Sequence, residues 1–116
     1  QLAFLATLFV ITADTRGNAG RLLKNFPVEI KILNSKNQNK EKRDFIKFLG
    51  SEKVIYIGNG ANDELASQLS RLSICIIGKE GCYTPTALKS HILVPSINDA
   101  LDLIIFPERL VATLRR

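Results

Sequence analysis

The sequence predicts an α/β fold, a Rossmann-like three-layer sandwich in which helices cover both faces of a mostly parallel sheet. Short apolar runs rich in β-branched residues alternate along the chain with segments of helical spacing. This alternation is typical of parallel strands joined by helices. One apolar run, 54–57, ends in a glycine-rich turn that leads directly into a helical segment. Turns of this kind lie at the ligand-binding edge of a parallel sheet.

The length and composition indicate one globular domain. The chain has 116 residues, of which 46% are hydrophobic and 23% charged, enough for one core but not for two. Its longest apolar stretch, 2–11, is too short to span a bilayer and lacks the positive start of a signal peptide. Because Gln1 runs straight into this stretch, we expect residues 1–116 to be an N-terminally truncated fragment.

Charge and cysteine content narrow the function classes. The net charge of +5 raises nucleic acid as a partner, but the chain has no Trp and no evident base-stacking platform. A solvated basic face or a small anionic substrate is favoured instead. Cys75 lies in a strand-like run, as a small buried hydrophobe would. With Cys82 it forms no CxxC pair, so we expect a reduced, cytoplasmic protein without a metal cluster.

The first half is predicted to contain two strands and two helices. Pro27 ends the first helix, because the residue before a proline is pushed out of the α region. Gly50 suits the end of the second helix, which places Phe45, Ile46, Phe48 and Leu49 on one side. The expected elements are strands over 7–12 and 28–33 and helices over 16–25 and 40–49.

The second half continues the alternation. Pro85 and Pro107 stand at first helical positions, and Ser96 is expected to cap a helix that has Asp99 in its first turn. The expected elements are strands over 54–57, 71–77 and 91–94 and helices over 62–70, 84–89, 97–105 and 107–114.

Polar side chains follow strands or open helices at three places. A hydroxyl and an ammonium hold phosphate oxygens, and amide and carboxylate oxygens hold Mg²⁺. Each cluster alone is weak evidence for a phosphate site, because Asx turns and solvated lysines are common. From the residues alone, a shared phosphate site and ordinary turn chemistry stay equally open. The clusters are Thr12 with Asp14 and Thr15, Lys42, and Asn59 with Asn62 and Asp63.

The order of these clusters resembles the haloacid dehalogenase-like hydrolases, and within them the P-type ATPase phosphorylation domain and its soluble relatives. Such pumps carry Thr-Gly-Asp where this chain has Thr12-Ala13-Asp14, and Gly-Asp-Gly-x-Asn-Asp where it has residues 58–63. Lys42 stands at the place of the motif between them. The similarity continues to 110–115 and covers nearly the whole chain.

The resemblance implies a role for each site residue. In that family an aspartate ending the first strand attacks phosphorus, and water hydrolyses the aspartyl-phosphate. The implied catalytic residues are Thr12, Lys42 and Asn62; the same three with Asp14 would bind phosphate, and Asn59 and Asp63 would bind Mg²⁺.

Two departures from the family pattern concern catalysis. No Asp-x-Asp-Gly-Thr or Asp-Lys-Thr-Gly-Thr motif occurs in the sequence. We therefore expect the first, central strand to be missing, together with the nucleophile, from between the strands that end at Thr12 and Ile57. Asn59 also replaces the usual metal-binding aspartate, which weakens Mg²⁺ binding because an amide carries no charge.

Three functions follow as hypotheses. The leading one is a Mg²⁺-dependent phosphohydrolase acting through an aspartyl-phosphate that an upstream segment supplies. Its partner would be a small phosphorylated substrate or nucleotide, with no nucleic acid and no membrane segment in this chain. The alternatives are a fragment of a P-type cation-transporting ATPase and a non-catalytic binding or regulatory module. The residues leave the substrate and the oligomeric state open.

Overall fold

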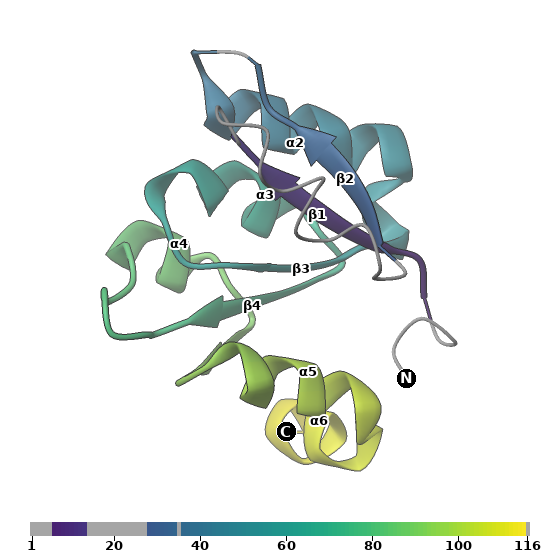
Figure 1. Ribbon diagram of the computed structural model, residues 1–116. Coiled ribbons are helices and arrows are strands. Elements are labelled where there is room, and N and C mark those ends of the chain that lie inside the picture. Colours follow the sequence, from purple (N-terminus) through teal and green to yellow (C-terminus); the bar gives the residue numbers. More distant parts are fainter. Residues whose placement is uncertain (1–5, 14–27, 35, 116) are drawn as a thin grey trace. The chain divides into compact units, whose positions relative to one another are not determined.

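The structure is a computed structural model that describes residues 6–13, 28–34 and 36–115. The chain divides into two compact units, residues 1–38 and 39–116, and each is described by itself. Figure 1 labels most of the elements. In chain order they are β1 (Leu8–Thr12), β2 (Val28–Ile32), α2 (Gln38–Leu49), η2 (Ser51–Lys53), β3 (Ile55–Gly58), η3 (Ala61–Asp63), α3 (Glu64–Leu69), β4 (Leu72–Ile76), α4 (Thr84–Leu88), β5 (Ile92–Val94), α5 (Ile97–Ile105) and α6 (Pro107–Leu114).

The first unit contains a pair of parallel strands. β1 and β2 pair in register from Leu8 opposite Val28 to Thr12 opposite Ile32. The backbone N–H of Leu33 donates to the carbonyl of Thr12 at 2.8 Å and extends the pairing by one residue. Both predicted strands are confirmed. The helix predicted over 16–25 lies outside the described residues.

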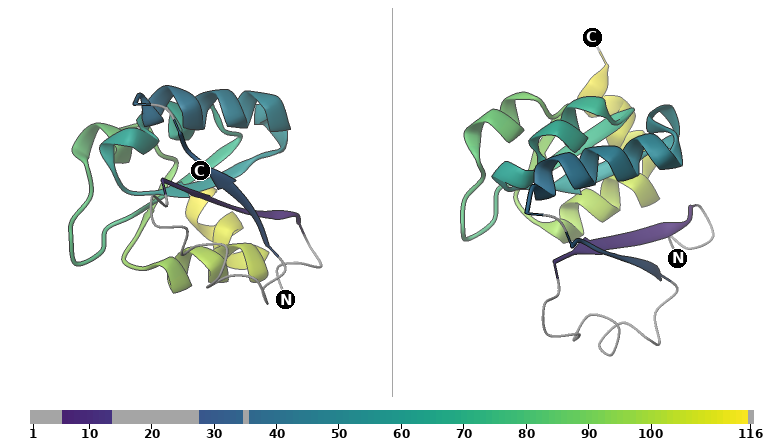
Figure 2. Two further views of the ribbon diagram at one scale, coloured as in Figure 1. Left: turned by 45° about the horizontal axis from the view of Figure 1, so that its top comes forward. Right: turned by 90° about the horizontal axis from the view of Figure 1, so that it is seen from above.

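The second unit is a three-stranded parallel sheet with helices on its two faces. The strand order is β3-β4-β5, with Ile57 opposite Ile74 and Ile74 opposite Ile92. Helix α3 packs against β3 and β4, and α5 packs against β4 and β5. Figure 1 and the left view of Figure 2 show α3 on one side of β3 and β4, and α5 with α6 on the other. The predicted α/β class with parallel strands is confirmed.

The main apolar core of this unit lies between the sheet and its last two helices. Ile74, Ile92 and Val94 of the strands and Ala100 of α5 are buried together, and Leu110 of α6 packs against them. Burying each large aliphatic side chain contributes about 1.5 to 3 kcal/mol. The core therefore ties α5 and α6 to the sheet and explains the apolar spacing along residues 97–114.

Local sequence signals set the ends of two helices. The Ser96 hydroxyl accepts a hydrogen bond from the Asp99 backbone N–H at 3.2 Å and caps α5. Helix α2 begins two residues before the predicted start and ends at Leu49. Gly50 follows it with a φ of 95°, in the left-handed region. The predictions of Ser96 as a cap and of Gly50 as a helix stop are confirmed.

The predicted apolar side of α2 is partly wrong. Phe48 is 80% exposed, whereas Ile46 is 2% exposed. Residues four apart share a helix face, so the face that buries Ile46 also carries Lys42, which is 9% exposed. Phe48 points elsewhere and stacks on Phe45, with the ring centroids 6.3 Å apart. A charged residue therefore occupies a position on the buried face of this helix.

The expectation of free cysteines is wrong. Cys75 is fully buried in β4, as predicted, but it forms a disulfide with Cys82, the Cα atoms lying 7.4 Å apart. The chain reverses direction after β4, where Gly78 and Gly81 form an antiparallel bridge. This reversal returns Cys82 to the end of β4, which the spacing of the two cysteines alone did not reveal.

Candidate functional site

The turn that follows β3 is organised by one carboxylate. The strand ends at Gly58, and the chain passes through Asn59 and Gly60 into the short helix η3, which Asp63 ends. The Asp63 side chain points back at the turn, and its Oδ2 accepts the backbone N–H groups of Asn59 and Gly60, each at 3.0 Å. These two hydrogen bonds fix the backbone of the glycine turn around the Asp63 carboxylate.

Lys42 of α2 reaches this turn from a distant part of the chain. Its ammonium donates to Asn62 Oδ1 at 2.9 Å and to Asp63 Oδ1 at 2.8 Å. The ion pair is buried, since the side chains of Lys42 and Asp63 are 11% and 8% exposed. The structure thus brings together three of the predicted site residues. The carboxylate and the amide fix the ammonium in one position, and a preorganised donor of this kind can act on a developing negative charge.

Tyr56 is a member of this cluster that sequence reasoning missed. Its hydroxyl donates to Asp63 Oδ1, the oxygen that also accepts from Lys42. Burial raises the pKa of Tyr56, and the charge and hydrogen bond of Asp63 raise it further, so the phenol stays a donor. Side chains alternate along a strand, which places Tyr56 on the face of β3 that Gly58 shares. That alternation was the available signal.

The Asp63 carboxylate is saturated with donors. Each of its two oxygens accepts two hydrogen bonds, Oδ1 from side chains and Oδ2 from the backbone. Burial by itself raises the pKa of Asp63, but hydrogen bonds from Lys42, Tyr56 and the Gly60 N–H outweigh it and lower the pKa below its usual range. Asp63 is therefore a carboxylate at neutral pH.

The segment after β4 holds the turn from its other side. The Tyr83 N–H donates to the Asn59 carbonyl at 2.9 Å, and the Thr86 hydroxyl donates to the Gly60 carbonyl at 2.8 Å. Thr86 is fully buried. The backbone of the turn is thus fixed by bonds to its N–H groups and to its carbonyls. No motif in the sequence pointed to these two residues.

The other predicted site residues, Thr12, Asp14 and Thr15, precede the second unit in the sequence. Thr12 ends β1 in the first unit, where its carbonyl accepts from Leu33. Asp14 and Thr15 lie outside the described residues. That Thr12 and Asp14 share a phosphate site with Lys42 stays a prediction.

The two predicted magnesium ligands, Asn59 and Asp63, differ in whether they have an oxygen to offer. Mg²⁺ takes oxygen ligands in octahedral geometry. The Asn59 side-chain amide offers such an oxygen beside the turn. Asp63 would have to break existing hydrogen bonds, because both of its oxygens already accept two. Within the described residues, no group of three or more His, Cys, Asp or Glu side chains is placed to hold a metal ion.

Comparison with known proteins places the chain in a family. No family model matches it. The uncharacterized protein MJ0073 of Methanocaldococcus jannaschii is 52% identical over 65 residues, which are 56% of this chain and 70% of that protein. The chain belongs to the MJ0073 family. The name of that relative states no activity, so the comparison indicates that the two proteins are related and gives no function.

Two solved structures share the fold of this MJ0073-family chain. The catalytic domain of the CPx-ATPase CopB-B matches 88% of it with a TM-score of 0.70 and 24% identity. A chain described as a HAD family hydrolase from Streptomyces avermitilis matches 77% of it with a TM-score of 0.59 and 11% identity. The chain spans 40% and 50% of their respective lengths. The fold is therefore haloacid dehalogenase-like, as the sequence resemblance predicted.

None of the described helices is long and apolar enough to cross a membrane.

Replacing Tyr56 by Phe tests the contribution of its hydroxyl. We expect Tyr56→Phe to lower the free energy of unfolding by about 2 kcal/mol, because a buried carboxylate loses a hydrogen bond while the ring packing is kept. Urea denaturation measures the change. Tyr83→Phe is the matched control, since Tyr83 is 46% exposed, and it should lie within about 0.5 kcal/mol of the parent. Equal losses in the two variants would show that the hydroxyl of Tyr56 contributes nothing specific.

Proposed function

We propose that this chain is the core of a haloacid dehalogenase-like phosphohydrolase that acts on a small phosphorylated compound or nucleotide in the cytoplasm. The reaction would transfer the phosphoryl group to an aspartate supplied by an upstream segment, and water would then release phosphate. The observation that carries the proposal is the buried Lys42 ammonium held beside the glycine turn by Asn62 and Asp63. The haloacid dehalogenase-like fold supports it.

Each described residue would contribute by position or charge. Lys42 would neutralise the negative charge that accumulates on the phosphoryl group and on the attacking carboxylate. Asp63 and Asn62 would hold the ammonium in one place, so that no rearrangement is needed during the reaction. Thr12 and Asp14 would bind phosphate oxygens. Nucleic acid is not proposed as a partner, because the role of the site is to hold a single phosphoryl group.

Magnesium would be held at Asn59, with further oxygen ligands from outside the described residues. The ion would neutralise phosphate charge when bound. Asp63 would hold Lys42 and the turn in place rather than bind Mg²⁺ directly, since each of its two oxygens already accepts two hydrogen bonds. The sequence prediction that Asp63 binds metal directly is therefore the less favoured role.

A phosphatase assay on the full-length protein tests the proposal. With Mg²⁺ and p-nitrophenyl phosphate, we expect Lys42→Ala to lower kcat/KM by about 10²-fold or more, because a preorganised charge at the phosphoryl group is lost. Lys47→Ala is the matched control on the exposed part of the same helix and should keep full activity. The 116 residues alone should show no turnover, because they carry no nucleophile motif. Robust Mg²⁺-dependent hydrolysis by Lys42→Ala would contradict the proposal.

A second candidate is the phosphorylation domain of a P-type cation-transporting ATPase. The match to the CopB-B catalytic domain, with a TM-score of 0.70, favours it. Membrane-spanning helices encoded on either side of this region would select it over a stand-alone enzyme.

A non-catalytic regulatory module is favoured by Asn59, since a neutral amide replaces a carboxylate. Absence of hydrolysis by the full-length protein across a broad panel of phosphate esters would select the module.

A further inference from the structure

The disulfide lies directly beside the candidate site. Cys75 is the residue of β4 that pairs with Gly58, where the glycine turn begins. Its partner Cys82 precedes Tyr83, whose N–H donates to the Asn59 carbonyl. One sulfur is therefore fixed in the strand next to the turn, and the other is one residue from a direct contact with it.

We propose that Cys75 and Cys82 are a reversible redox pair that controls how firmly the turn at 58–63 is held. In the oxidised protein the disulfide fixes the segment 76–83 to β4, so the Tyr83 N–H stays on the Asn59 carbonyl. In the reduced protein this segment is released at Cys82. The effect on catalysis rests on the proposed function, whereas the effect on the turn does not.

The exposure of the two sulfurs sets the order of the reaction. Cys75 is fully buried, while Cys82 is partly exposed. Oxidation begins when the Cys82 thiolate attacks a low-molecular-weight disulfide and expels one thiolate, leaving a mixed disulfide on Cys82. The Cys75 thiolate then attacks Cys82 Sγ and expels the second thiolate. The two protein protons end on the two small thiols, and a low-molecular-weight dithiol reverses both steps.

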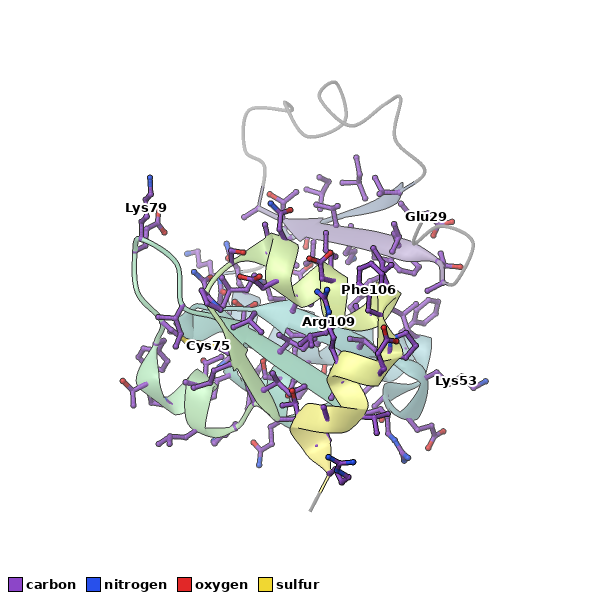
Figure 3. All side chains as sticks on the ribbon, turned by 90° about the horizontal axis from the view of Figure 1, so that it is seen from below. Glu29, Lys53, Cys75, Lys79, Phe106 and Arg109 are labelled. Carbon is purple, nitrogen blue, oxygen red and sulfur yellow. A yellow bond between two sulfur atoms is a disulfide. The ribbon has the colours of Figure 1, made fainter. Side chains whose placement is uncertain are left out.

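The loop between the cysteines has few other attachments to the site. Gly78 and Gly81 bridge each other, and Ile77 N–H donates to the Val94 carbonyl at 2.8 Å. Figure 3 shows Lys79 at the tip of the loop, pointing away from the rest of this unit, and Cys75 close to the strands. Once the disulfide opens, the contact between Cys82–Tyr83 and the turn depends on the Tyr83 N–H and on the Thr86 hydroxyl further along.

Amide hydrogen exchange of the 116-residue chain tests the proposal. We expect reduction with dithiothreitol to speed exchange of the Tyr83 amide by about tenfold, since local opening no longer has to break a covalent tie. Cys82→Ser, which leaves the buried Cys75 in place, should show the same fast exchange with or without reductant. Lys79→Ala, at the loop tip, should keep the slow exchange and its response to dithiothreitol. The His91 amide, bonded to the Ser73 carbonyl, reports that the sheet stays folded.

Two results would overturn the proposal. One is alkylation of Cys82, the partly exposed cysteine, in the air-oxidised, folded protein before any reductant is added. The other is a Tyr83 exchange rate unchanged by dithiothreitol and by Cys82→Ser, while the His91 amide remains protected. Neither measurement depends on turnover, so failure of the redox proposal and failure of the phosphohydrolase proposal are told apart.

Discussion

Asp63→Ala is expected to lower the free energy of unfolding by about 3 to 5 kcal/mol, the cost of leaving a buried charge without its partner. The substitution removes the acceptor of four hydrogen bonds at once. The Lys42 ammonium loses its carboxylate partner and keeps its hydrogen bond to Asn62 Oδ1. The backbone N–H groups of Asn59 and Gly60 lose their acceptor. Urea denaturation followed by circular dichroism measures the loss.

Two companion variants show where the loss comes from. Glu64→Ala removes the adjacent carboxylate, whose ion pair with Lys89 is more exposed, and should cost about 1 kcal/mol or less. Lys42→Met in the Asp63→Ala background should recover part of the stability, because the unpaired buried charge is gone. A loss after Asp63→Ala no larger than after Glu64→Ala would contradict the central role of this carboxylate.

The same carboxylate gives the stability a defined pH dependence. The pKa of Asp63 is lower in the folded protein than the value of about 3.9 expected in the unfolded chain. Its contribution is therefore fully present above the unfolded pKa and is lost as the pH falls through the folded pKa. The difference in stability between the parent and Asp63→Ala should stay constant from pH 7 to about pH 5 and shrink below about pH 4. A difference that grows on acidification would reverse the assigned sign.

Much of the fold followed from local signals in the sequence. Apolar runs predicted four of the five described strands, because parallel strands buried on both faces carry little polar surface. The alternation of apolar and polar residues over 28–33 predicted the fifth. Ser96, Pro107 and Gly50 marked helix ends through capping chemistry that acts within a few residues. The expected further central strand stays a prediction.

Features that depend on distant contacts were harder to predict. Tyr56 looked like one more apolar strand residue, and only the position of Asp63 shows that its hydroxyl has a charged acceptor. Lys42 would have counted as a solvated lysine without the family resemblance, because no local pattern tells a buried lysine from an exposed one. Cys82 lies next to Cys75 because the chain reverses direction between them. The composition of this loop does not determine the geometry of the reversal, so the disulfide could not be predicted.

Gly58→Ala is expected to destabilise the protein by about 3 kcal/mol, because the added methyl group enters space that Asp63 occupies. A Cβ at position 58 would lie 2.5 Å from Asp63 Cγ and 2.7 Å from Oδ2. This side chain cannot swing away cheaply, since its hydrogen bonds hold both of its oxygens. Overpacking of a well-packed site costs about 1 to 3 kcal/mol or more. Chemical denaturation measures the change.

Gly78→Ala is the matched control for the glycine substitution. The nearest atom to a Cβ at position 78 is Ile76 Cγ2 at 4.0 Å, an ordinary contact, so the change should be within about 1 kcal/mol of zero. In the Asp63→Ala background the cost of Gly58→Ala should fall, because the Cγ and Oδ2 that the methyl group meets are absent, although the Cβ of residue 63 remains at 2.9 Å. A cost that is undiminished in that background would mean that the backbone of the turn, rather than the Asp63 carboxylate, requires glycine at position 58.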